Sequence, residues 1–329
     1  MLYNIIMNLP LWLKTESERL AALLDRGQLP HAVLIHGPVG VGRRLLAFWL
    51  MEQLLEHTAG SPDPTRLGAG RIDEELLPVH PDFRLLQPLE DKKTISVAQV
   101  RELIEFLALT SHQSGAKVVI VAPAQAMTIS AANCLLKTLE EPATNSFLIL
   151  VADSLSRLPA TIVSRCQRVR VALPDRQVAG KWLHGLEPDV DWQAALELSA
   201  GAPLAALEWQ QIEFPQLVAK MTQDLSALQQ RTKTPANVAK RWVKYDPEPC
   251  LRWLFNQLSA EIRTQIARHE HKPIAKPEVD RLQKSGETLN MESSFTVLRQ
   301  IGELRRIQGS GLNFELHLTD VLTRWYAGD

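Results

Sequence analysis

The chain has 329 residues, 45% of them apolar, which is enough to fill the cores of two or three domains. Its 36 Lys and Arg residues almost balance its 37 Asp and Glu residues, so the formal net charge is −1. A chain this close to neutral is not drawn to nucleic acid by its overall charge, which argues against a general DNA-binding protein. We therefore expect any DNA contact to be local or to be made by a partner.

The cysteines and the apolar segments indicate where the protein works. The three cysteines, Cys134, Cys166 and Cys250, lie far apart and form no C-x-x-C pair, which favours a reducing cytoplasm over a disulfide framework. No run of about 18 apolar residues is present, so we expect no membrane span. The apolar start lacks a basic segment and a small-residue cleavage site, so we expect no signal peptide.

Strand-like and helix-like segments alternate in the first half of the chain. Short apolar runs separated by helices are typical of a parallel sheet that is buried on both faces. We predict five strands, at residues 32–36, 83–87, 117–121, 147–151 and 168–171.

Two helix starts between these strands carry a capping signal. Ser96 followed by Gln99 is a capping box. Thr128 is placed to cap a second helix, which we expect to stop before Pro142.

Strand signals disappear after residue 175, and the rest of the chain is helical in pattern. We predict an α/β domain over 1–172, a small helical domain over 173–208 and an all-helical domain over 209–329. The expected anchors of the last core are its tryptophans, Trp209, Trp242, Trp253 and Trp325.

The stretch VLIHGPVGVGRRLLAFWL, residues 33–50, begins like a phosphate-binding loop. Gly37, Gly40 and Gly42 would let backbone N–H groups approach a phosphate. An active loop then has Lys to reach the phosphates and Ser or Thr to bind Mg²⁺, but Arg43 and Arg44 stand here instead. Two interpretations stay open: a turn that needs glycines only for its geometry, or nucleotide binding without turnover. We expect no productive ATP binding and no cofactor.

A second strand end has also lost the residues that hydrolysis needs. An ATPase of this type places acidic residues directly after a buried strand, one for Mg²⁺ and one to polarise the attacking water. Here KVVIV is followed by Ala122 and Pro123, which can do neither. We therefore expect no catalysis at this site.

Three motifs resemble the clamp-loader branch of the AAA+ family. They are HPDF at 80–83, LLKTLEEP at 135–142 and SRC at 164–166, and the block 117–167 is similar to the family without a gap. The resemblance implies a P-loop AAA+ domain with a parallel sheet, a helical lid domain and a helical collar domain that holds a ring of subunits together.

The resemblance gives the SRC motif, Ser164, Arg165 and Cys166, a role in catalysis. It implies that Arg165 is an arginine finger, which reaches the ATP held by a neighbouring subunit. Two other interpretations stay open for Arg165: an ion pair with a local carboxylate, or a cap on the preceding helix. Cys166 is more typical of a small buried hydrophobe than of a nucleophile.

The sequence departs from the family at two further places. Many relatives carry a four-cysteine zinc module after the P-loop helix, but residues 51–79 contain no Cys and only His57, so we expect no metal and a loop at 58–78 in its place. Active relatives also have an Arg early in the helix after a Gly-Ser-Pro-like turn. The corresponding stretch here, residues 201–204, has no Arg.

Polar residues in two of the motifs have structural interpretations. His80 and Asp82 are expected to form a turn in which Asp82 binds nearby N–H groups, and not a metal or acid–base site. Lys137, Glu140 and Glu141 are spaced to form an exposed helix pair, or to contact another subunit.

Together these features predict a catalytically silent stator subunit of the clamp loader of bacterial DNA polymerase III. The resemblance implies partners of the gamma or tau and delta types, and action on the sliding clamp and primed DNA through the complex. The alternative within the family is an ATP-hydrolysing motor subunit like gamma or tau. A small-molecule kinase is disfavoured because its Lys and its Mg²⁺-binding hydroxyl are both missing.

Overall fold

The protein is described by a computed structural model, in which the chain divides into two compact units. Unit 1 comprises Met1–Leu196 and Gly201–Glu208, and unit 2 comprises Glu197–Ala200 and Trp209–Asp329. The expected division into three domains stays a prediction. The structure describes residues 9–55, 80–90, 92–111, 115–212, 214–269, 291–307 and 313–327.

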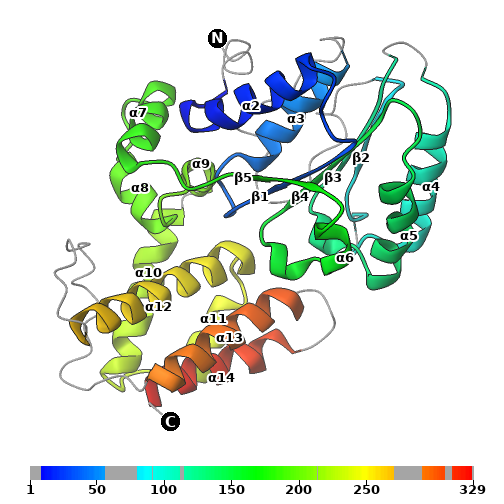
Figure 1. The fold of residues 1–329 in the computed structure, drawn as a ribbon. Coiled ribbons are helices and arrows are strands. Elements are labelled where there is room, and N and C mark those ends of the chain that lie inside the picture. Colours follow the sequence, from blue (N-terminus) through cyan, green and yellow to red (C-terminus); the bar gives the residue numbers. More distant parts are fainter. Residues whose placement is uncertain are drawn as a thin grey trace. The chain divides into compact units, whose positions relative to one another are not determined.

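Unit 1 contains a five-stranded sheet in the order β2-β3-β4-β1-β5, and every neighbouring pair is parallel (Figure 1). The predicted parallel sheet is confirmed, and each predicted strand overlaps an observed one with a difference of at most one residue at either end. The strands are β1 Ala32–His36, β2 Phe83–Leu86, β3 Lys117–Val121, β4 Ser146–Ala152 and β5 Gln167–Arg170.

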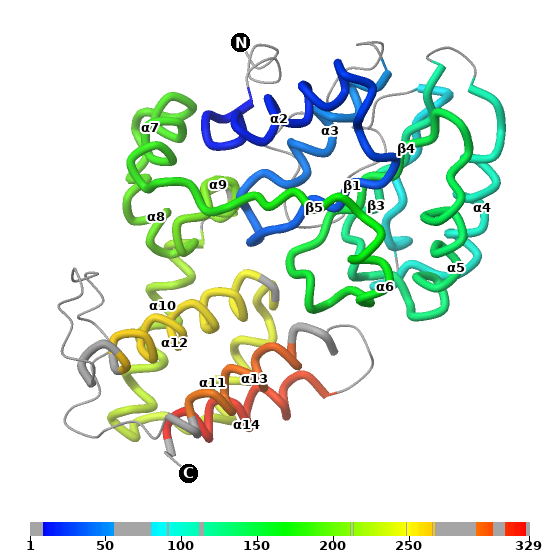
Figure 2. Tube along the Cα trace, in the orientation of Figure 1, coloured from blue at the N-terminus to red at the C-terminus, as the bar shows by residue number. Residues whose placement is uncertain are grey.

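Helices cover both faces of this sheet, as the apolar strands require. Figures 1 and 2 show α2 and α3 on one face and α4, α5 and α6 on the other. After β5 the chain continues through α7, α8 and α9. The helices are α2 Lys14–Asp25, α3 Arg43–Leu54, α4 Val97–Ala108, α5 Ile129–Glu140, α6 Ala160–Val163, α7 Arg176–Leu186, α8 Trp192–Leu198 and α9 Pro203–Gln211, with short 3-10 turns at Leu11–Leu13, Ala124–Ala126 and Leu155–Arg157.

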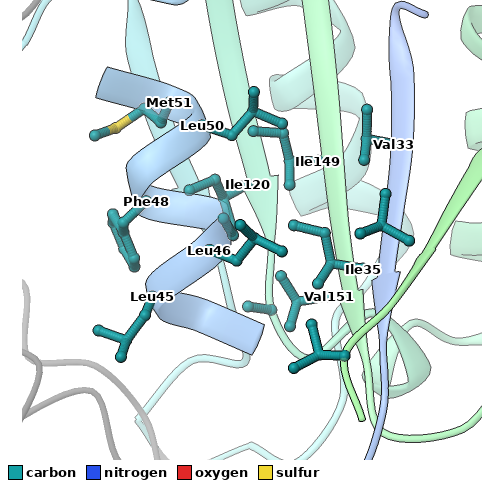
Figure 3. Close-up of a cluster of buried hydrophobic side chains, with 14 of the residues drawn as sticks. Val33, Ile35, Leu45, Leu46, Phe48, Leu50, Met51, Ile120, Ile149 and Val151 are labelled. Atoms are coloured by element: carbon teal, nitrogen blue, oxygen red, sulfur yellow. The ribbon is translucent and has the colours of Figure 1, made fainter. Parts of the chain in front are cut away.

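Alternate strand residues enter two separate cores, because successive side chains of a strand point to opposite faces. Val33 and Ile35 of β1 pack with α3, whereas Leu34 packs on the side of α4 and α5. Figure 3 shows Leu46 and Leu50 of α3 against the strand side chains. Each such side chain contributes about 1.5–3 kcal/mol by its burial. The loop between β1 and α3 is therefore held firmly at both ends.

Both predicted helix caps are confirmed. Ser96 Oγ accepts the N–H of Gln99 over 3.3 Å, and Gln99 Oε1 accepts the N–H of Ser96 over 3.1 Å. Thr128 Oγ1 accepts the N–H of Ala131 over 3.1 Å at the start of α5. The helix ends at Glu140, before Pro142, so Glu140 stands at its C-terminal end.

The elements that the structure describes in unit 2 are all helices, and the four predicted tryptophan anchors are all buried. A buried carboxylate supports one of them: Asp224 accepts the indole N–H of Trp242 over 3.0 Å and pairs with Lys233 and Arg241. Of the helices described, none has the length and hydropathy to cross a membrane. The helices of this unit are α10 Phe214–Gln229, α11 Pro235–Trp242, α12 Pro247–His269, α13 Met291–Ile307 and α14 Phe314–Ala327.

Candidate functional site

The glycine loop joins β1 to α3 and depends on glycine for its shape. Gly37, Gly40 and Gly42 have φ values of +155°, +84° and +97°. A Cβ atom at Gly37 would lie 2.0 Å from the carbonyl oxygen of Val171, the residue after β5. No side chain fits there, since real Cβ contacts do not come below about 3 Å. The geometric interpretation of these glycines therefore has a direct structural basis.

The first turn of α9 packs directly on this loop. The N–H of Leu204 donates to the carbonyl oxygen of Gly40 over 2.9 Å. A Cβ atom at Gly40 would lie 2.6 Å from Cβ of Ala205 and 3.2 Å from Cβ of Ala202. Both alanines are buried, in the core that also contains Val41. Nothing can enter between Gly40 and α9 unless the two are separated.

Arg44 stands where an active loop has the Ser or Thr whose hydroxyl binds Mg²⁺. It interacts with the charge of Glu208 on α9. It is half-buried, and burial lowers the pKa of its guanidinium to about 10, while the negative charge of Glu208 on α9 opposes that shift. Arg44 remains a cation at neutral pH and has no oxygen to offer a metal. Its charge adds an attraction between α3 and α9 beside the Gly40–Leu204 hydrogen bond.

The start of the loop is surrounded by positive charge. The pKa of His36, the last residue of β1, is lowered by burial and then by Arg170, Arg168 and Arg43. Arg170 stands opposite His36 in the register of β1 and β5. The imidazole is therefore neutral at physiological pH. Arg43 and Arg44 begin α3 at this point, where an active loop has Lys and Ser or Thr.

The end of β3 offers no acid or base. Ala122 is buried, and its N–H donates to the carbonyl oxygen of Leu86 over 3.0 Å. Pro123 follows it. On the neighbouring strand, β4, the next residue is Asp153, whose carboxylate pairs with Arg157 at 2.7 Å. The acidic side chain at this edge of the sheet thus belongs to a local ion pair.

Arg165 lies between α6 and β5 and is held by Glu140 at the end of α5. Its Nε and Nη2 atoms contact Glu140 Oε1 at 2.8 Å and 2.5 Å. Its Nη1 donates to the carbonyl oxygen of Thr161 in α6 over 3.1 Å. Both local interpretations from the sequence therefore apply, the carboxylate pair and the contact to the preceding helix. The helix pair suggested for Lys137, Glu140 and Glu141 is corrected for Glu140, which pairs with Arg165. The alternative, a contact with another subunit, stays a prediction.

The other two residues of the SRC motif differ in exposure. Ser164 is exposed, and its hydroxyl donates to the carbonyl oxygen of Thr161 over 3.2 Å. Cys166 is buried, and burial raises the pKa of its thiol to about 12. The thiol therefore stays protonated, as expected of a buried hydrophobe and not of a nucleophile.

Comparisons with known proteins identify the family. Residues 13–175 match the family model described as DNA polymerase III, delta subunit. The chain is 30% identical over 315 residues to DNA polymerase III subunit delta' of Pseudomonas aeruginosa, covering 91% of this chain and 93% of that one. It is also 30% identical over 318 residues to the subunit delta' of Haemophilus influenzae, with 95% of each chain covered. The chain belongs to the DNA polymerase III subunit delta' family.

The resemblance of the motifs, together with the residues of the glycine loop, predicts this subunit, and that prediction is confirmed. Among solved structures, a DNA polymerase III gamma subunit-related protein of Thermotoga maritima matches with 18% identity and a TM-score of 0.47, over 96% of this chain and 99% of that one. The family match spans the glycine loop and the SRC motif, the two features that form the candidate site of this delta' family member.

In the HPDF motif of this delta' family member His80 and Asp82 are buried, and Asp82 also takes part in an ion pair. Its carboxylate pairs with Lys117 of β3 at 3.5 Å and accepts the Ser111 hydroxyl over 3.1 Å. Its own N–H donates to His80 Nδ1 over 3.1 Å. The ion pair with Lys117 adds to the expected turn, and the bonds from Asp82 to nearby N–H groups stay a prediction. The ion pair between Asp82 and Lys117 could have been predicted from the sequence, because Lys117 is the one charged residue in the apolar strand KVVIV.

The loop expected at 58–78 and His57 lie outside the described residues. Within the ranges that the structure does describe, no group of three or more His, Cys, Asp or Glu side chains could hold a metal ion.

Proposed function

We propose that this delta' family member is a clamp-loader subunit that does not hydrolyse ATP and that supplies Arg165 to an ATP molecule bound by a neighbouring subunit. The observation that carries the proposal is the packing of α9 on the glycine loop, through the Leu204–Gly40 hydrogen bond and the buried alanines Ala202 and Ala205. These contacts leave no room for a side chain between Gly40 and the start of α9.

The missing side chains support the same conclusion. Hydrolysis needs a Lys and a hydroxyl on the loop and carboxylates after a neighbouring strand. Arg43, Arg44, Ala122 and Pro123 occupy these positions. Arg44, in addition, faces the charge of Glu208 on α9. On this proposal the loop keeps its glycines for packing and needs no metal or nucleotide of its own.

Arg165 is suited to act on a neighbour's nucleotide. Its side chain is 36% exposed, so part of it is accessible from outside the subunit. The planar guanidinium can contact two phosphate oxygens at once, which a Lys ammonium cannot do with the same geometry. An arginine supplied in trans contributes about 10³–10⁵ to the rate of phosphoryl transfer. On this proposal the subunit is no enzyme by itself, and its Arg165 completes the ATP site of the neighbouring subunit.

The relatives' names suggest the partners. A further relative, 25% identical over 162 residues, is the DNA polymerase III subunit gamma of Buchnera aphidicola. We infer that gamma or tau and delta subunits assemble with this chain, with the helices of unit 2 in the ring-forming collar. Through that complex the subunit would act on the sliding clamp and primed DNA.

The test compares two exposed arginines in the reconstituted complex. The rate of DNA-stimulated ATP hydrolysis is measured with wild type, Arg165→Ala and Arg157→Ala. Arg157 is a matched control, because its side chain is 39% exposed and it also pairs with a carboxylate, that of Asp153. We expect Arg165→Ala to lower the rate about 10³-fold at the site it serves and Arg157→Ala to leave it unchanged. An unchanged rate with Arg165→Ala in an intact complex would refute the finger.

The motor alternative is tested on the purified subunit alone. We expect no ATP turnover above background. A turnover that Arg43→Ala abolishes would replace the proposal with an ATP-hydrolysing subunit like gamma or tau.

A further inference from the structure

We propose that Glu140 is a positioning residue for Arg165, an inference that rests on the proposed function of Arg165 as a finger. The contact is specific: two nitrogens of the guanidinium, Nε and Nη2, meet the single oxygen Oε1 of Glu140 at 2.8 Å and 2.5 Å. A third nitrogen, Nη1, is fixed by the carbonyl oxygen of Thr161. The guanidinium is therefore held on two sides.

Both partners stand next to residues that are buried in the core. Glu140 follows Leu139, which is 3% exposed, and Arg165 precedes Cys166, which is 9% exposed. Both of these neighbours, together with Ile162 of α6, belong to one apolar core. Because α5 and α6 pack in that core, buried side chains fix the positions of Glu140 and Arg165 relative to each other.

The contacts leave part of the guanidinium available. Arg has five N–H groups. Glu140 accepts one from Nε and one from Nη2, and Thr161 accepts one from Nη1, with Ser164 Oγ at 3.5 Å from the same nitrogen. Among the described residues, at least one N–H of Nη2 has no acceptor. Glu140 therefore orients the guanidinium and leaves a donor for an oxyanion.

This arrangement favours positioning over masking. A masking carboxylate would occupy the donors that a phosphate needs, and it would have to leave before the finger acts. Glu140 instead holds the side of the guanidinium while the side chain of Arg165 stays 36% exposed. Fixing the long arginine side chain before the neighbour arrives means that its conformational entropy is lost on folding and not in the reaction.

The chain offers a matched control one residue away. Glu141 has the same charge and is also exposed, and the structure gives it no ion pair with any residue that it describes. Glu141→Gln therefore changes the local charge as Glu140→Gln does, without touching the contact to Arg165.

The contact is tested first in the isolated subunit. The Nε–H signal of Arg165, assigned with the Arg165→Lys variant, is followed in ¹H–¹⁵N spectra. We expect Glu140→Gln to shift this signal and speed its exchange with water, and Glu141→Gln to leave it in place. An Nε–H signal that Glu140→Gln does not move would overturn the inference.

Its consequence is tested in the reconstituted complex by the kinetics of ATP hydrolysis. We expect Glu140→Gln to lower kcat about tenfold with KM for ATP unchanged, because misplacing a catalytic group costs rate and not ground-state binding. The double variant Glu140→Gln/Arg165→Ala should be no slower than Arg165→Ala alone.

Two outcomes separate the inference from the function it rests on. If Arg165→Ala lowers the rate but Glu140→Gln leaves it equal to wild type, or raises it, the positioning role is refuted and the finger stands. If Arg165→Ala has no effect, the proposed finger fails and the positioning role fails with it.

Discussion

The N–H of Leu204 donates to the carbonyl oxygen of Gly40 over 2.9 Å, which joins the first turn of α9 to the glycine loop. The two residues are 164 positions apart, but the contact is as short as a hydrogen bond within a helix. Gly40 is needed here for two reasons: its φ of +84° and the closeness of Ala205. These two reasons can be separated by experiment.

We predict that Gly40→Ala destabilises unit 1 by about 2–4 kcal/mol, the sum of backbone strain and a clash with Ala205. Gly201 is the matched control, since its φ is +83° and a Cβ atom there would meet nothing within 4 Å. Gly201→Ala should cost about 1–2 kcal/mol, from strain alone. Urea unfolding of both variants measures the difference. Equal losses would mean that α9 does not press on the loop.

We predict that Arg44 and Glu208 stabilise the contact of α3 with α9 as a coupled pair. Burial lowers the pKa of Arg44, so its charge has lost part of its hydration and Glu208 compensates for it. In a double-mutant cycle with Arg44→Gln and Glu208→Gln, the coupling energy should be about 1–2 kcal/mol. The exposed pair Lys14–Glu18, at 3.8 Å, is the control and should give below about 0.5 kcal/mol. A coupling no larger than that of the control would contradict the prediction.

The sheet could be predicted from the sequence because its strands carry a local signal. Segments such as 117–121 are continuously apolar, and burial on both faces produces that pattern. The caps at Ser96 and Thr128 were predictable for the same reason, since a cap and the N–H it accepts lie within three residues. Such features can be predicted from a short stretch of sequence, because the groups that interact lie within a few residues of each other.

The contacts that define the candidate site could not be predicted in this way. Glu140 and Arg165 are 25 residues apart, and nothing in the spacing of either motif tells which carboxylate meets which cation. The sequence shows that Arg43 and Arg44 follow the glycines of the loop, but not that α9 packs on Gly40. That contact depends on small residues at Ala202 and Ala205, which have no signature of their own.

We predict that Lys117→Met destabilises unit 1 by about 3–5 kcal/mol, because it removes the cation that pairs with the buried carboxylate of Asp82. Asp82 is 0% exposed and Lys117 3% exposed, so water cannot replace the lost partner. The substitution also removes the ammonium from above the ring of Phe106, 4.1 Å from its centroid. Urea unfolding measures the loss. The double variant Lys117→Met/Asp82→Asn should recover part of it, and a double variant as unstable as the single one would contradict the buried-charge explanation.

The buried thiols give a prediction about pH. Burial raises the pKa of Cys166 to about 12, against an ordinary value of 9.0, and burial with the charge of Asp246 does the same for Cys250. At a pH between 9.0 and about 12, each buried thiol keeps its proton in the folded chain, whereas the same thiol has lost it in the unfolded chain. The free energy of unfolding should therefore fall as the pH rises above about 9, by about 1 kcal/mol per pH unit for each thiol.

This dependence is checked by urea unfolding at pH 8 and pH 10, with the variant Cys166→Ala as the comparison for unit 1. The difference between wild type and variant isolates the thiol, because Arg44 titrates equally in both. We expect the variant to lose less stability between the two pH values than wild type. Alkylation at pH 8 gives a second measure: iodoacetamide should modify the partly exposed Cys134 well before the two buried thiols. Rapid labelling of Cys166 in the folded protein would show that the SRC motif is open to solvent, and its thiol would then be a candidate for chemistry of its own.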